Sequence, residues 1–132
     1  MGQQIAVAQL NDNARLSSKI ITSTRDAGAV TGNVAYTGVG FTPTSVHALA
    51  VVDGTLYNCK GFADSTKTGW AVYQSAANVY YVANTLVTYS NQSAWAQNGY
   101  IATFDTDGFT MTWTRVGTPT AGTIKLYFIC YR

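Results

Sequence analysis

Few side chains in this sequence are of the types that perform acid–base or nucleophilic chemistry, and they lie far apart. The single histidine, His47, is enclosed in the apolar run Val46-His47-Ala48-Leu49. No serine lies in the G-x-S-x-G turn that presents a nucleophile. Asp105 and Asp107 could form a carboxylate pair, but they flank a glycine turn, where aspartate is favoured for its backbone hydrogen bonds. We expect no catalytic residue and no enzymatic activity, and we expect His47 to be a hydrogen-bonded structural side chain.

Metal and cofactor chemistry is equally poorly supported. The cysteines, Cys59 and Cys130, have no C-x-x-C spacing, and the chain has no second histidine. The segment Asp105-Thr106-Asp107-Gly108 is similar to the start of a calcium loop, but the later ligands are missing. We therefore expect no metal, no cofactor and two buried free thiols. A disulfide would require their strands to be neighbours.

Aromatic side chains are the remaining candidates for binding. Trp113 lies on an alternating segment and is expected in the core. Trp95 falls in the polar stretch 91–98, and Tyr80-Tyr81 must place one ring on each face of a strand. Exposed aromatic rings either stack on sugars or fill subunit interfaces. Because the chain has few charges, we favour an interface, and we keep Trp95, Tyr80 and Tyr81 as candidates for glycan stacking.

Composition limits the class of protein further. The chain has 132 residues, which suits one domain, and only 11% of them are charged. The net charge is +2 and the Lys and Arg residues are scattered, so we expect no nucleic-acid partner. No apolar run reaches the roughly 20 residues that cross a bilayer, and the start lacks a secretory pattern. We expect no membrane insertion.

The residues that must form the scaffold favour strands throughout. Glu is absent, Thr is the commonest residue, and Asp clusters at glycine turns. The apolar run 45–52 predicts a central strand covered on both faces, followed by an Asp53-Gly54 hairpin turn. Further strands are expected at 30–36, 55–62, 70–74, 79–82, 86–89, 99–104, 109–114 and 123–131. This pattern predicts an all-β fold, an antiparallel two-sheet β-sandwich of jelly-roll type with eight or nine strands.

The two ends of the chain suggest contacts with other molecules. Residues 1–27 lack aromatic side chains and are predicted to form an N-terminal arm, with a short helix at 12–19, ahead of a sandwich at 28–132. A terminus packed on the core is the alternative. The arm's candidate anchoring residues are Arg15, Leu16, Lys19, Ile20 and Arg25. The last strand is apolar or aromatic on both faces, so Tyr127, Ile129 and Tyr131 are the predicted interface of a homo-oligomer, a trimer being favoured.

Several motifs add a resemblance that covers about residues 30–132. They are G-F-T-P-T-S-V at 40–46, G-F-A-D at 61–64, F-D-T-D-G-F-T-M-T-W-T at 104–114 and the closing G-T-I-K-L-Y-F-I-C-Y-R. This part of the chain resembles small β-sandwich proteins on the virions of tailed bacteriophages, namely head decoration or cement proteins and fibre modules. The D-G-F-T-x-T-W-T hairpin is also similar to the H-type lectin domain, whose sugar-contacting residues have no counterpart here that we could place.

The resemblance implies a structural protein on the virion surface, assembled in the host cytoplasm. In this interpretation the arm binds the major capsid protein or another virion protein. The alternative is a carbohydrate- or receptor-binding fibre module that contacts a host surface glycan. A lectin-like domain of cellular origin is a third interpretation.

Overall fold

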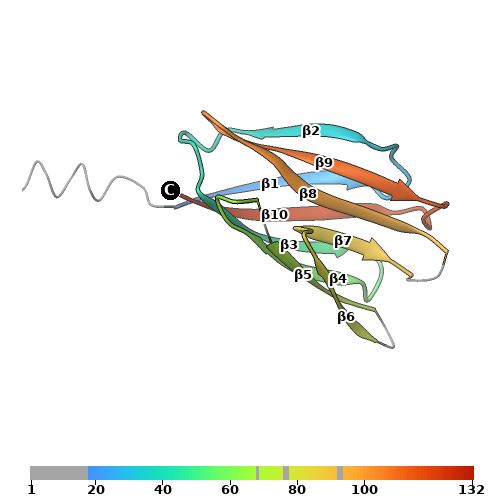
Figure 1. Cartoon of the computed structure of the whole chain (residues 1–132). Coiled ribbons are helices and arrows are strands. Elements are labelled where there is room, and N and C mark those ends of the chain that lie inside the picture. Colours follow the sequence, from blue (N-terminus) through green and yellow to red (C-terminus); the bar gives the residue numbers. More distant parts are fainter. Residues whose placement is uncertain (1–17, 68, 76–77, 92–93) are drawn as a thin grey trace, which may run out of the picture.

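Ten β-strands make up the fold in the computed structural model, which describes residues 18–67, 69–75, 78–91 and 94–132 (Figure 1). The strands are β1 (Ser18–Asp26), β2 (Gly32–Thr37), β3 (Ser45–Val52), β4 (Asn58–Ala63), β5 (Gly69–Gln74), β6 (Val79–Ala83), β7 (Val87–Ser90), β8 (Ala96–Asp105), β9 (Gly108–Val116) and β10 (Thr123–Tyr131). They form a six-stranded sheet, ordered β1-β10-β3-β4-β5-β6, and a four-stranded sheet, ordered β2-β9-β8-β7. The predicted all-β sandwich of two antiparallel sheets is confirmed.

The topology is simpler than the jelly roll that the sequence predicted. Strands β3 to β6 follow one another in one sheet, and β7 to β9 follow one another in the other, so both groups are meanders. A jelly roll would instead pass back and forth between the sheets. Strand β10 completes the larger sheet by pairing with both β1 and β3. The count of ten exceeds the expected eight or nine because β1 lies in the segment expected to be an arm.

The core lies between the sheets and follows the period-2 alternation of the strands. On β9 the side chains of Phe109, Met111 and Trp113 are fully buried, as the alternation from Phe109 to Thr114 predicted. Leu126 and Phe128 on β10 of the larger sheet are also buried, and the Phe128 ring contacts that of Phe109 with centroids 5.1 Å apart. The indole of Trp113 donates a hydrogen bond to the Tyr36 hydroxyl at 3.0 Å, so the largest buried side chain keeps its polar atom satisfied.

The turn between β8 and β9 is hydrogen-bonded to the loop between β2 and β3, which connects the two sheets. The carboxylate of Asp107 accepts hydrogen bonds from the backbone N–H groups of Gly38 and Gly40, at 3.0 and 2.6 Å. These bonds hold the pKa of Asp107 below its usual value. The hydroxyl of Thr110 donates to Asp105 at 2.7 Å. The Asp105–Gly108 segment is therefore a turn whose carboxylates act within the fold.

Strand β1 corrects the predicted division of the chain at residue 27. Residues 18–26 pair along their whole length with β10, so they are an edge strand of the sandwich. The predicted helix at 12–19 is wrong for Ser18 and Lys19, which begin β1, and its remaining residues lie outside the described part of the chain. Aromatic residues are unnecessary on this strand because it covers only the margin of the core.

Arg25 on β1 has an internal role in place of the predicted anchoring role. Its guanidinium lies 4.6 Å from the ring centroid of Trp113 and donates to the side-chain oxygen of Gln97 at 3.2 Å. The buried Gln97 amide in turn donates to the carbonyl oxygens of Ala27 and Ala29. Arg25 and Gln97 thus fasten the end of β1 and the following loop to the four-stranded sheet.

Candidate binding face

The six-stranded sheet has an outer face that none of the residues described by the structure covers. On β3 the side chains of Val46, Ala48, Ala50 and Val52 are buried, whereas His47, Leu49 and Val51 point away from the core and are exposed. The expectation that 45–52 is covered on both faces is therefore wrong for the single chain. An apolar run can alternate between a buried and an exposed face, and periodicity alone does not distinguish that case.

Strand pairing arranges the outward side chains in rows that cross the whole sheet. The first row runs through Ile20, Ile129, His47, Phe62, Trp70 and Ala83. The second runs through Thr22, Tyr127, Leu49, Lys60, Val72 and Tyr81. The third runs through Thr24, Lys125, Val51, Asn58, Gln74 and Val79. We call these three rows the outer face.

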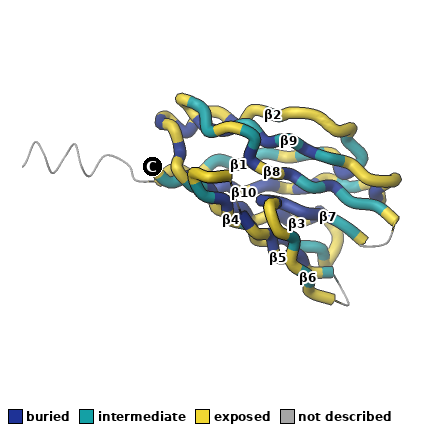
Figure 2. The backbone as a smooth tube through the Cα atoms, viewed as in Figure 1, coloured by how far each residue is buried: buried dark blue, intermediate teal, exposed yellow. Residues whose placement is uncertain are grey.

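The outer face concentrates the exposed hydrophobic side chains of the described residues. Nine of the thirteen large ones belong to it: Ile20, Leu49, Val51, Phe62, Trp70, Val72, Val79, Tyr81 and Tyr127. With ordinary residue areas, these nine residues together expose on the order of 1,000 Å², although polar side chains of the same rows lie among them, and exposed apolar patches larger than a few hundred Å² mark interaction sites. Figure 2 shows the exposed colour recurring along these strands, and on β6 exposed residues alternate with intermediate ones. A patch of this size is typical of a surface that another molecule covers.

An aromatic pair stands at one side of this face. The side chain of Trp70 on β5 is 65% exposed and that of Tyr81 on β6 is 69% exposed. Their ring centroids lie 5.9 Å apart with a 34° angle between the planes. Trp70 was not among the predicted binding residues, because the alternation of 69–74 does not by itself say which side faces the core.

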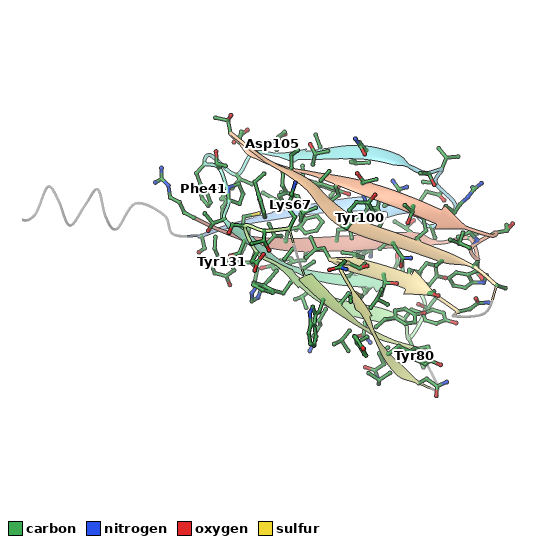
Figure 3. All side chains as sticks on the ribbon, in the orientation of Figure 1. Phe41, Lys67, Tyr80, Tyr100, Asp105 and Tyr131 are labelled. Atoms are coloured by element: carbon green, nitrogen blue, oxygen red, sulfur yellow. The ribbon has the colours of Figure 1, made fainter. Side chains whose placement is uncertain are left out.

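Tyr81 is one of the three residues predicted to stack on glycans, and the other two, Trp95 and Tyr80, are not placed for that role. Trp95 is half-buried against Tyr89, with ring centroids 4.6 Å apart, and does not stand out from a polar loop. Tyr80 lies on the inner side of β6 and packs against the core (Figure 3). Of the three candidates, only Tyr81 is on the outer face.

At the opposite side the face is hollowed. A depression of about 670 Å³ lies over β1, β10 and β3. It is lined mainly by Thr22, Thr24, Leu49, Val51, Lys125 and Tyr127. The short side chains of Thr22 and Thr24 on β1 stand beside the longer Tyr127 and Lys125 of their rows, and this difference in size contributes to the hollow.

The predicted oligomer residues all point away from the core. Tyr127, Ile129 and Tyr131 alternate on β10 with the buried Leu126, Phe128 and Cys130, as the sequence predicted. Tyr127 and Ile129 belong to the outer face, and Tyr131 lies at the end of β10 (Figure 3). Whether another chain covers them remains a prediction.

Charges are sparse on the outer face. Lys60 lies near its centre, between Leu49 and Val72 in its row. Lys125 is paired with Asp53 in the adjoining turn, with 3.2 Å between nitrogen and oxygen. The centre of the face therefore has one cationic side chain with apolar neighbours on both sides in its row.

His47 differs from its predicted structural role. Its ring is on the exposed side of β3, with edge-to-face contacts to Phe62 and Tyr131 at centroid distances of 4.9 and 5.2 Å. It was expected to be a hydrogen-bonded side chain because its neighbours in sequence are apolar, but those neighbours point to the other side of the strand.

The cysteines lie in the core, as predicted, and are free thiols. Cys59 is on β4 and Cys130 on β10, and β3 separates these strands, so the condition for a disulfide is not met. Burial raises the pKa of each thiol to about 11. Within the described ranges, no three His, Cys, Asp or Glu side chains gather as a metal site. The described residues also include no helix able to span a membrane.

Comparison with known proteins yields little. No protein-family model matches the sequence. No curated protein matches it either. Among solved structures, a similar chain is the tailspike protein of Acinetobacter baumannii bacteriophage Fri1, a capsular polysaccharide depolymerase, with 8% identity and a TM-score of 0.37. The similarity covers 87% of this chain and 18% of the tailspike, and at this level it carries no argument about activity.

Proposed function

We propose that this chain is a non-enzymatic structural protein of a tailed-bacteriophage virion, most simply a decoration or cement protein on the outer capsid surface. The observation that carries the proposal is the uncovered apolar outer face of the six-stranded sheet. A domain that exposes this much apolar surface is stabilised and kept from aggregating when the surface is buried in an assembly.

Two features of the sequence support the virion as that assembly. The motifs at 40–46, 61–64 and 104–114 resemble those of phage β-sandwich surface proteins. The 11% charged fraction also suits a protein whose flanks meet other proteins. The expected partners are the major capsid protein or another virion protein, and further copies of this chain.

The capsid contact is assigned to the segment that precedes β1. Of the five anchoring candidates, Arg25 serves the fold, whereas Arg15 and Leu16 lie in residues 1–17, outside the described part of the chain. Lys19 and Ile20 at the start of β1 are both exposed and adjoin this segment. The proposed anchor therefore consists of residues 1–17 together with Lys19 and Ile20 at the start of β1, and the sandwich projects from it.

Glycan binding is the second candidate, and one observation favours it. Trp70 and Tyr81 present two exposed rings side by side, which is the geometry that stacks on the apolar faces of sugar rings. The chain would then be a receptor-binding fibre module that contacts a host surface glycan.

Virion composition tests the proposal. Purified virions are expected to contain the protein at a copy number close to that of the major capsid protein, measured by quantitative mass spectrometry. Virions lacking it should bind the purified full chain and should not bind a chain without residues 1–17 that retains its β-sheet circular dichroism. A tail-like copy number would favour the fibre module, and absence from virions would overturn the proposal.

A further inference from the structure

We propose that each copy of this chain seats its Trp70–Tyr81 pair in the hollow over β1, β10 and β3 of a neighbouring copy, forming a closed ring. This inference rests on the proposed function, because it names one occupant of the same outer face. It adds which part of one copy meets which part of the next.

The two contacting parts lie at opposite sides of one face. Trp70 and Tyr81 project from β5 and the edge strand β6. The hollow lies on the other side of β4, over β3, β10 and the other edge strand, β1. A single chain cannot bring its own β5–β6 side onto its own β1–β10 side, so the contact requires a second copy.

Size and chemistry match between the two parts. The hollow of about 670 Å³ falls within the range of roughly 300–1,000 Å³ that holds drug-sized molecules, so it has room for two aromatic side chains. Its lining is mainly apolar, with Leu49, Val51 and Tyr127, and it also includes the hydroxyl-bearing Thr22 and Thr24 and the side chain of Lys125. These are suitable partners for an indole and a phenol, whose rings are apolar and whose edges donate hydrogen bonds.

The area of the outer face also suits a second copy. Its nine large hydrophobic side chains expose on the order of 1,000 Å², and a stable protein interface buries about 800 Å² on each partner. The hydrophobic positions extend from Ile20 on β1 to Tyr81 on β6, so the β1–β10 side and the β5–β6 side both have apolar surface to bury.

Charge favours a head-to-tail contact over two sheets stacked face to face. Stacking about a two-fold axis at the centre of the face would bury Lys60 close to Lys60 of the other copy, and its row neighbours Leu49 and Val72 provide no acid. When only the β5–β6 side covers the next copy's β1–β10 side, Lys60 on β4 stays at the middle, open to water. Such heterologous contacts form a ring when the rotation from one copy to the next closes, and three copies are the smallest such ring.

Light scattering coupled to gel filtration tests this with the full chain. The expected mass is about 42 kDa, three times the 14.1 kDa chain, or a larger closed ring. Trp70→Ala/Tyr81→Ala and Thr22→Arg, which fills the hollow, are each expected to give monomers with unchanged β-sheet circular dichroism. The matched control Tyr100→Ala, on the other sheet, should keep the ring. Mixing the two monomeric variants should restore a two-chain complex at most, because one intact pair and one intact hollow remain.

Other outcomes overturn the inference and identify the actual occupant. A wild-type monomer that still decorates virions would leave the proposed function standing and exclude self-association. A wild-type dimer would indicate stacked faces. A ring that survives both variants, or that is lost only on deleting residues 1–17, would assign the contact elsewhere. A monomer whose Trp70 fluorescence is quenched by a host polysaccharide would assign the pair to glycan binding.

Discussion

Gln97 links three parts of the fold although it is an uncharged side chain on a strand of the smaller sheet. It is fully buried, donates to the carbonyl oxygens of Ala27 and Ala29, and accepts from Arg25. Replacing it by alanine would remove all three bonds and would leave the buried carbonyl oxygen of Ala27 without this partner, at a cost of roughly 1–3 kcal/mol for each buried group left unsatisfied. These hydrogen bonds of Gln97, which we call the Gln97 clamp, therefore stabilise the fold without an ion pair.

Gln97→Ala should lower the free energy of unfolding by roughly 2–4 kcal/mol, measured by urea denaturation. The control is Gln74→Ala, which removes the same functional group from the exposed side of β5 and should change stability by less than about 1 kcal/mol. Equal changes in the free energy of unfolding for the two variants would show that the Gln97 clamp makes no specific contribution to stability.

Asp107 makes a pH-dependent contribution. Hydrogen bonds from Gly40 and Gly38 lower the pKa of its carboxyl in the folded state, so its stabilisation is present above the ordinary aspartate pKa of about 3.9. It is lost as the pH falls through the lower, folded value. Asp107→Asn should therefore melt at a lower temperature than wild type at pH 7, with the gap closing below about pH 4.

Differential scanning fluorimetry at several pH values measures that gap. Asp53→Asn is a suitable control, since it also removes one negative charge but only from an exposed pair with Lys125. A gap for Asp107→Asn that stays constant from pH 7 to pH 3 would mean that the carboxylate charge is irrelevant to the loop.

At the level of elements, the two sheets approach each other closely where the chain crosses from β6 to β7. A Cβ added to Gly61 on β4 would collide with the backbone carbonyl of Leu86, just before β7. Gly61→Ala must push the two sheets apart there and should cost roughly 3 kcal/mol or more. Gly32→Ala, in open space on β2, should stay within about 1 kcal/mol of wild type. Chemical denaturation of both variants checks this, and equal stability would show that the crossover relaxes easily.

Strand β9 and strand β10 were predictable because alternation with period 2 fixes which side chains share a face. Phe109, Met111 and Trp113 could be assigned to the core, and Tyr127 to the opposite side of β10, from spacing alone. Strand β1 could not be predicted, because its side chains are only shallowly buried and its pairing with β10 joins opposite ends of the sequence. The exposure of Leu49 was missed for a related reason: an apolar side chain does not reveal which molecule covers it.

For the whole molecule, the central claim is that the outer face is covered when the protein is in its working assembly. The inert native cysteines make this measurable, since both are buried and a thiol pKa of about 11 leaves little thiolate at neutral pH. A single introduced cysteine therefore reports its own surroundings. Val72 lies within the outer face and is 45% exposed in the single chain, whereas Val116 on the other sheet is 58% exposed.

The most direct measurement is maleimide labelling of Val72→Cys and Val116→Cys in purified virions, with the unfolded proteins as the reference for complete reaction. The account predicts that Val116→Cys reacts and that Val72→Cys is protected at least tenfold in rate, because another chain covers it. Equal, rapid labelling at both positions would contradict the account, since it would show that the outer face stays open to solvent in the assembled virion.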